Sequence, residues 1–379
     1  MEHTFWIWYP GDFELYHAMK QNFSRVERGF GWPAFWKSEG FRNRVAFRRT
    51  YELKQETSFT VFSNAIGHVL VTWENGEKKY PFGKKITAGP GKVKVSIHAG
   101  CVEAFPCAYV QGEVIHSDKT WMAEDYSQPL VPVGVCKYFT KPEQKPTVWE
   151  YTEKECKPVK ISEINGGVLA EFETELTAAV YVKDKRKAAL EKEKQKVVKN
   201  IENCYEGNAE EISDAGKCRR ESGSGDNCDV LEVFCGESED EALDLEHCYY
   251  SWQPDPATNR CPCCAVRFAF IPNCKAEDVE ITAFYQYVDF PKRASFKCSD
   301  KKLNKIWEVA EHTFRLCSGI FFLDGVKRDK WIWSGDAYQS FFVNQYLLAD
   351  PDIDQRTLLA LRGNDPMTRH INTIMDYSL

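Results

Sequence analysis

The feature that most constrains the fold of this 379-residue chain is a change in its hydrophobic period near residue 298. Before it, stretches such as 168–182 alternate apolar and polar residues, which is typical of strands with one solvated face. After it, apolar residues recur at +0, +3, +4, +7, +11 and +14, which is typical of an amphipathic helix: Leu303, Ile306, Trp307, Ala310, Phe314 and Cys317. The sequence therefore predicts β domains followed by helices.

The first β domain is predicted over residues 44–135. Short segments rich in β-branched and aromatic residues recur there, separated by Gly and Pro, which favours a β-sandwich: RVAFRRTYEL, SFTVFSNA, HVLVTW, GKVKVSIHAG, CAYVQGEVI and VPVGVCKYF. Glu74-Asn75-Gly76 follows the third segment directly and predicts a hairpin turn. The preceding segment, 1–43, is aromatic and irregular, and we assign it no regular structure.

A second β-sandwich is predicted over residues 161–296, after a linker at 136–160 that is rich in Lys, Glu and Pro. The clear alternation at 168–182 indicates a long strand in this domain. A charged insertion at 183–228 interrupts the domain, and we interpret it as a solvated helix followed by a loop. The alternative is a helix that binds a partner protein.

Helices are predicted over 297–379. Ser299 or Asp300 could cap the first helix, and a second fits 337–349. Asp350, Pro351 and Gly363 mark the start and end of a third, and a fourth begins near Asp365-Pro366. Four helices in about 80 residues do not form an obvious closed core. Either they pack on the β domains, or 297–379 is the incomplete start of a larger helical domain.

Composition and charge exclude several classes of function. The net charge of −7 and the pI of about 5.8 disfavour nucleic acid and anionic membrane as partners. No apolar run is long enough to span a bilayer, and the N-terminus lacks the pattern of a secretory signal. We therefore expect a cytoplasmic protein whose 15 cysteines are free thiols.

The sequence contains no phosphate-loop, dinucleotide-binding or zinc-protease motif, so no cofactor is expected. Whether the chain forms a homo-oligomer stays open.

A cluster of cysteines at Cys261-Pro262-Cys263-Cys264 raises the question of a metal site. Structural zinc sites usually show two separate C-x2-C pairs, and this cluster runs directly into a predicted strand. We therefore favour buried thiols over zinc, and we predict no metal ligand.

The densest chemistry lies in FFLDGVKRDKWIWSGDAYQS, residues 321–340, between the first and second predicted helices. Carboxylates next to Trp rings suit glycoside hydrolysis, because one carboxylic acid must protonate the leaving oxygen while other groups hold the sugar. A simpler interpretation is structural: Asp336 would be the N-cap of the second helix, and Asp329 would pair with a Lys or an Arg. The spacing alone does not separate the two interpretations.

The segment DGVKRDKWIWSGDA resembles the signature of the bacterial α-L-rhamnosidases of glycoside hydrolase family 78, approximately D-x-x-x-R-E-R-x-G-W-x-G-D-A. GESEDEALDLEHCY, residues 236–249, and the order of β-sandwich domains before helices also resemble that family. The resemblance is specific over about residues 299–349. It implies β-sandwich domains followed by the first helices of an (α/α)6 barrel. The implied activity is release of terminal α-L-rhamnose, with inversion, from a rhamnose-containing glycoside or oligosaccharide.

The resemblance also implies residue roles. Asp329 stands at the position of the general acid, which is Glu in the family. Four further residues match positions that bind the sugar: Asp324, Arg328, Trp333 and Asp336.

Two departures and one gap follow from the comparison with the family pattern. Asp329 is one methylene shorter than Glu, and a misplacement of about 1 Å can cost ~10²-fold in rate. Ile332 replaces the Gly before the Trp. An inverting enzyme also needs a second carboxylate, about 6.5–9.5 Å from the acid, as general base. The resemblance places that base later in the barrel, so we expect it beyond residue 379 and expect this chain alone to be nearly inactive.

Two alternatives to the rhamnosidase function stay open. One is a non-catalytic carbohydrate-binding protein, and the other is a glycosidase of the same barrel fold acting on another sugar.

Overall fold

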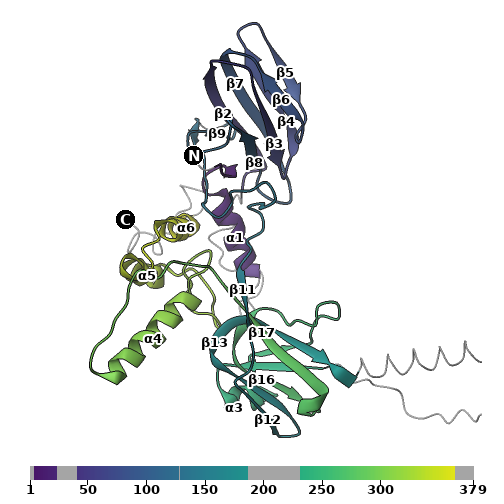
Figure 1. Ribbon diagram of the computed structural model, residues 1–379, viewed down its shortest axis with the longest axis vertical. Helices are drawn as coiled ribbons and strands as arrows, with labels where there is room; N and C mark the ends of the chain where they lie inside the picture. Colours follow the sequence, from purple (N-terminus) through teal and green to yellow (C-terminus); the bar gives the residue numbers. More distant parts are fainter. Residues whose placement is uncertain (1–3, 24–40, 128, 187–230, 363–379) are drawn as a thin grey trace, which may run out of the picture. The chain divides into compact units, whose positions relative to one another are not determined.

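A computed structural model describes residues 4–23, 41–127, 129–186 and 231–362. The chain divides into two compact units (Figure 1). Unit 1 combines Met1–Glu150 with Val288–Leu379, and unit 2 is Tyr151–Tyr287. Unit 1 is therefore built from two separate stretches of sequence. The predicted fourth helix, the residue Gly363 and most of the charged insertion at 183–228 lie outside the described residues.

The first part of unit 1 is a β-sandwich of two antiparallel sheets, as predicted. One sheet has the order β1-β8-β3-β6 and the other β10-β9-β2-β7-β4-β5. The strands are β1 (Ile7–Trp8), β2 (Arg44–Leu53), β3 (Thr57–Ser63), β4 (Ile66–Trp73), β5 (Gly76–Tyr80), β6 (Lys85–Ala88), β7 (Gly91–Gly100), β8 (Cys107–Gly112), β9 (Met122–Glu124) and β10 (Val131–Pro132). The predicted hairpin is confirmed, because Trp73 pairs with Gly76 across the turn between β4 and β5.

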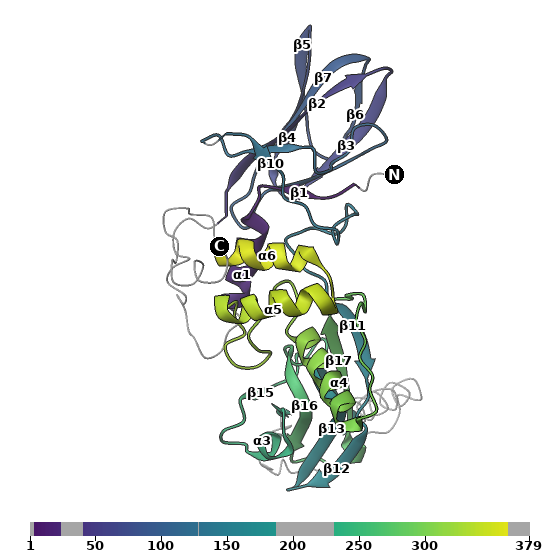
Figure 2. The same ribbon diagram turned by 90° about the vertical axis from the view of Figure 1, so that its left-hand side faces the viewer.

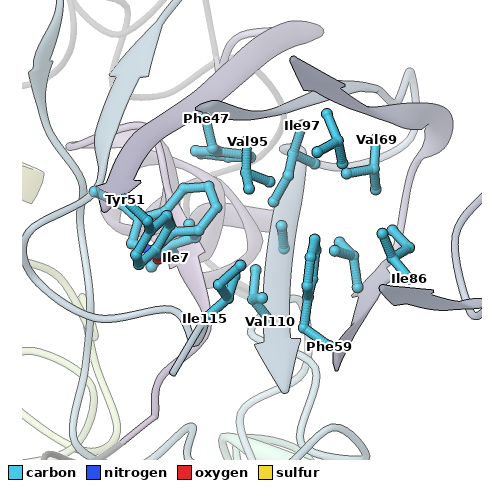
Figure 3. Close-up of a cluster of buried hydrophobic side chains, with 14 of the residues drawn as sticks. Ile7, Phe47, Tyr51, Phe59, Val69, Ile86, Val95, Ile97, Val110 and Ile115 are labelled. Carbon is cyan, nitrogen blue, oxygen red and sulfur yellow. The ribbon is translucent and has the colours of Figure 1, made fainter. Parts of the chain in front are cut away.

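The core of this sandwich lies between the two sheets. Figure 3 shows Phe47, Val95 and Ile97 from one sheet facing Phe59 and Val110 from the other. Alternate residues of each strand point to one face of the sheet, so the alternation in the sequence supplies these buried side chains. This period of two is the reason that the sequence predicts the sandwich correctly.

The N-terminal segment, predicted to be irregular, contains regular structure. β1 pairs with β8, and helix α1 spans Asp12–Phe23. α1 is covered on most sides, and Phe13, Leu15 and Ala18 are all buried. A helix buried on most sides needs no single apolar stripe, so its sequence carries no helical period. Aromatic residues dominate the cluster around it, which also takes in part of the 136–160 segment: Trp6, Trp8, Phe13, Phe105, Tyr109 and Phe139, with Trp149 packed against them.

The three predicted helices within the described residues are present in unit 1 as α4 (Lys301–Leu316), α5 (Ser334–Leu347) and α6 (Pro351–Arg362). Asp300 caps α4, its side chain accepting hydrogen bonds from the backbone N–H groups of Lys302 and Leu303. Asp350 Oδ1 accepts from the backbone N–H of Asp352, 2.9 Å away, at the start of α6. α5 begins three residues earlier than predicted.

α6 lies between α1 and α5 in the packing of unit 1. Figure 2 shows α6 beside both α5 and α1, and Ala18 of α1 shares a buried cluster with Ala360 and Leu361 of α6. The apolar stripe of α4 is less covered, because Leu303 is 48% exposed and Ile306 is 54% exposed. The apolar stripe of α4 is therefore only partly covered within unit 1, where Trp307 and Phe314 pack against a buried cluster.

Unit 2 is a seven-stranded antiparallel sheet with the order β11-β17-β13-β16-β14-β15, in which β12 also pairs with β13. Its elements are β11 (Thr152–Cys156), β12 (Lys160–Ile164), β13 (Gly167–Asp184), β14 (Val233–Gly236), α3 (Glu239–Leu243), β15 (Tyr250–Trp252), β16 (Cys264–Pro272), η2 (Ala276–Asp278) and β17 (Val279–Tyr287). A bulge between Glu171 and Leu176 separates two halves of β13, one paired with β12 and the other with β17. The two halves of β13 therefore pair with different neighbours within one sheet, whereas the sequence predicted a sandwich of two sheets.

β11 lies within the segment predicted as a linker. It pairs with β17 from Thr152↔Tyr287 to Cys156↔Ala283. Four of its five residues are exposed, so its Lys and Glu side chains face solvent and give the sequence the composition of a linker.

No helix in the described part of the chain is long and apolar enough to cross a membrane.

Candidate active site

The loop between α4 and α5 carries four of the five predicted site residues, and it is anchored at both ends. The fifth, Asp336, lies in the first turn of α5. At its start, Phe321 and Phe322 are buried, and the Phe322 backbone N–H donates to Thr357 Oγ1 of α6 at 3.1 Å. At its end, Trp331 and Ile332 are buried, each about 1% exposed. These four side chains fix the ends of the loop and leave its middle to present polar groups.

Asp324 closes this loop through two contacts with Trp331. The Asp324 backbone N–H donates to the Trp331 carbonyl at 3.0 Å, and the Trp331 backbone N–H donates to Asp324 Oδ1 at 2.8 Å. Trp331 is thus a structural anchor whose ring lies in the core. The carboxyl group of Asp324 is held in place by the same pair of contacts.

Asp329 occupies a tight turn at the tip of the loop. Its φ is +60°, and the Lys330 backbone N–H donates to the Arg328 carbonyl at 2.8 Å, which defines a γ-turn centred on Asp329. This kind of turn is rare and strained. Lys330 also has a positive φ, and its carbonyl accepts from Gln21 Nε2 of α1 at 3.2 Å. The turn therefore persists because surrounding contacts hold it.

Trp333 lies against Asp329. Its indole Nε1–H donates to Asp329 Oδ2 at 3.3 Å, so the ring and the carboxylate are held together. This contact brings together the predicted acid and the predicted stacking residue. Trp333 is only partly buried, which leaves part of its ring available to a ligand.

The electrostatics of the loop link three carboxyl groups. The pKa of Asp324 is raised to about 6, first by burial and then by the negative charges of Asp329 and Asp336. A hydrogen bond from the Trp331 backbone opposes this rise. Like charges that share a site favour the protonated form of one of them. The three predicted carboxylates thus lie near enough to one another to interact, and the carboxyl group of Asp324 is partly protonated at about pH 6.

The remaining predictions for this loop have mixed outcomes. Arg328 and Asp336 are exposed. The prediction that Asp336 caps the second helix was wrong, because α5 starts at Ser334 and Trp333 holds the cap position without a side-chain hydrogen bond. Asp336 instead lies in the first turn of α5, where a negative charge interacts favourably with the helix dipole.

The cysteine cluster lies in unit 2, away from this loop in sequence. Cys261 and Cys264 are buried, and burial raises the pKa of Cys261 to about 12. A thiol with such a pKa is neutral at physiological pH. Within the described residues, no three His, Cys, Asp or Glu side chains are arranged to hold a metal ion.

The pKa of Asp324 leads to a prediction about stability. The folded protein binds the Asp324 proton more tightly than the unfolded chain, so this residue makes folding less favourable as pH rises from about 4 to about 6. Asp324→Asn keeps an oxygen for the Trp331 backbone and removes the charge. We expect this variant to melt higher than the parent at about pH 7.5, with a smaller difference at about pH 4. The exposed Asp289→Asn serves as the control, and equal shifts in both variants would contradict the expectation.

Comparisons with known proteins add the following findings. No family model and no curated protein matches the chain. Among solved structures, it is similar to an α-L-rhamnosidase from Dictyoglumus thermophilum, with 13% identity, 84% of this chain and 41% of that chain covered, and a TM-score of 0.37. It is also similar to the Streptomyces avermitilis α-L-rhamnosidase complexed with L-rhamnose, with 10% identity, 85% and 36% coverage, and a TM-score of 0.37. The chain spans less than half the length of either enzyme.

Proposed function

We propose that this chain belongs to a glycoside hydrolase of the α-L-rhamnosidase type, which releases terminal α-L-rhamnose from a glycoside with inversion of configuration. The observation that carries the proposal is the joint placement of Asp324, Asp329 and Trp333 in one anchored loop. The motif DGVKRDKWIWSGDA supplies these residues in the order that the rhamnosidase signature requires.

Asp329 is the proposed general acid. It is only partly buried, which leaves it accessible to a ligand, and the Trp333 indole N–H donates to one of its oxygens. The other oxygen would protonate the departing glycosidic oxygen. The positive φ of Asp329 supports this role, because strained backbone positions concentrate where a site needs one particular orientation. An Asp tolerates this conformation better than most residues, which suits the Asp found here.

The other four residues would bind the sugar. Trp333 offers a partly exposed ring for stacking against a sugar face. Asp324 would accept hydrogen bonds from sugar hydroxyls when it is ionised, and it donates one when it is protonated. The exposed side chains of Arg328 and Asp336 would add further polar contacts to the sugar hydroxyls. The proposal assigns no general base to the described residues.

The test is hydrolysis of an aryl α-L-rhamnoside by the 379-residue chain and by the product of any longer reading frame that contains it. Release of the aryl alcohol by either form, with β-L-rhamnose as first product, supports the proposal. Binding of L-rhamnose without hydrolysis in both forms would favour a carbohydrate-binding protein. Cleavage of a different aryl glycoside would keep the hydrolase class and replace the sugar.

A further inference from the structure

The turn that carries Asp329 is tied to a helix from the other stretch of unit 1. The carbonyl of Lys330, the next residue, accepts a hydrogen bond from Gln21 Nε2 at 3.2 Å. Gln21 lies in the last turn of α1, is half-buried, and precedes Lys330 by 309 residues. The contact therefore joins the two stretches of sequence that make up unit 1.

α1 is a firm base for this contact. Ala18, one turn before Gln21, shares a buried cluster with Phe321 and Ile332, which lie at the two ends of the loop. Residues three apart lie on the same side of a helix, so Ala18 and Gln21 face the loop together. The helix itself is held by the aromatic cluster around the fully buried Phe13. The loop thus meets α1 through apolar contacts at its ends and through a hydrogen bond at its tip.

Gln21 completes the hydrogen bonding of the backbone at the tip. The Lys330 N–H donates to the Arg328 carbonyl at 2.8 Å. The Trp331 N–H and carbonyl both bond to Asp324, at 2.8 Å and 3.0 Å. These three bonds lie within the loop, so they fix its shape and leave its position open. The bond from Gln21 to the Lys330 carbonyl comes from outside the loop, and it fixes the tip relative to the rest of unit 1.

Two consecutive residues of the turn have a left-handed backbone, with φ of +60° at Asp329 and +45° at Lys330. Residues other than Gly rarely adopt this conformation, and it persists only where surrounding contacts hold it. Loss of the contact from Gln21 should therefore let the turn relax and the Asp329 carboxyl group move with it. A displacement of about 1 Å at a reacting group can cost ~10²-fold in rate.

We infer that Gln21 is a positioning residue for Asp329, because it fixes the turn that aims this carboxyl group at the leaving oxygen of the substrate. This role rests on the proposed function, in which Asp329 is the general acid. It also extends the site to α1, which lies outside residues 299–349, where the resemblance to the family is specific.

The first test compares two substrates at about pH 7. Gln21→Ala removes the side chain, and Gln21→Glu keeps its size but, when ionised, has no donor. We expect either variant to lower kcat on an alkyl α-L-rhamnoside about tenfold with KM changed less than twofold. The loss should be much smaller on an aryl rhamnoside whose alcohol is strongly acidic, because that alcohol needs little protonation. General loosening of the fold would slow both substrates alike, so an equal loss on both, or no loss on the alkyl substrate, would overturn the inference.

The second test needs no activity and uses the 379-residue chain. The NMR signal of the Trp333 indole N–H, assigned by its absence in Trp333→Phe, reports the contact with Asp329. Asp329→Ala gives the position of this signal when the carboxylate is missing. We expect Gln21→Ala to move the signal toward that position. Gln55→Glu, an exposed control in the same unit, should change neither the signal nor kcat. An unmoved signal in folded Gln21→Ala contradicts the positioning role.

The two tests fail separately for the acid and for Gln21. Unchanged kcat in Asp329→Asn with a moved indole signal in Gln21→Ala would overturn the proposed function and support the positioning of Asp329 by Gln21. A large loss of kcat in Asp329→Asn with no change in either Gln21 variant would do the opposite. Melting curves show which variants are folded, and Gln21→Glu, which keeps the volume of the side chain, replaces Gln21→Ala if the latter is not.

Discussion

Replacing Asp329 by Asn is expected to lower the rate of rhamnoside hydrolysis by about 10²–10⁴-fold, the usual contribution of a general acid. The amide keeps the size of the side chain, tolerates the positive φ, and retains an oxygen for the Trp333 indole. Stability should therefore change by less than about 0.5 kcal/mol. The measurement is kcat on an alkyl α-L-rhamnoside, made on whichever form of the protein is active.

Varying the acidity of the leaving alcohol makes this test specific to the general acid. A substrate whose aryl alcohol is strongly acidic needs little protonation, so the loss in Asp329→Asn should be much smaller on it than on an alkyl rhamnoside. Asp329→Glu retains a proton donor and should keep far more activity than the amide. The exposed Asp289→Asn is the control. An unchanged kcat on the alkyl substrate in Asp329→Asn would rule out the assignment of the acid.

Replacing Phe13 by Ala is expected to cost about 3–5 kcal/mol of stability, the usual cost of emptying a buried aromatic site. Phe13 is fully buried, and its ring lies 5.0 Å from Trp8 and 5.7 Å from Phe139, measured between ring centres. Because α1 packs on α6, the loss should loosen the helices of unit 1 as well as its aromatic cluster. The midpoint of denaturant unfolding, followed by tryptophan fluorescence, measures the change.

Phe296→Ala is the matched control for Phe13→Ala. Phe296 belongs to the same unit and is 44% exposed, so its loss should cost about 1 kcal/mol or less. The two units need not unfold together, so the transition of unit 1 must be separated from that of unit 2 before midpoints are compared. Similar costs for both substitutions would show that α1 contributes little to the core.

The sequence predicted the fold correctly for elements that have one solvent-exposed face and one buried face. Alternation identified the sandwich strands, and the stripe from Leu303 to Cys317 identified α4. The same reasoning failed for α1, which is buried on most sides, and for β11, whose residues are mostly exposed. Neither α1 nor β11 has one buried and one exposed face, and a hydrophobic period in the sequence depends on that contrast.

The candidate site could be predicted in composition and only partly in geometry. Spacing placed Asp324, Asp329 and Trp333 in one loop between two helices. It did not reveal that Trp331 is buried while Trp333 contacts Asp329, since both are Trp in the same short segment. Nor did it reveal the γ-turn at Asp329, because no Gly marks that positive φ.

The discontinuous path of unit 1 has a consequence for synthesis on the ribosome. Unit 2 is one continuous stretch, and pairing of β11 with β17 brings its two ends together. It can therefore complete its own sheet as soon as β17 has emerged. α1 precedes unit 2 in the sequence, yet its packing partner α6 follows unit 2. The side of α1 that packs on α6 must therefore stay uncovered while all of unit 2 is synthesised, and it is the surface that a nascent-chain chaperone would have most reason to cover.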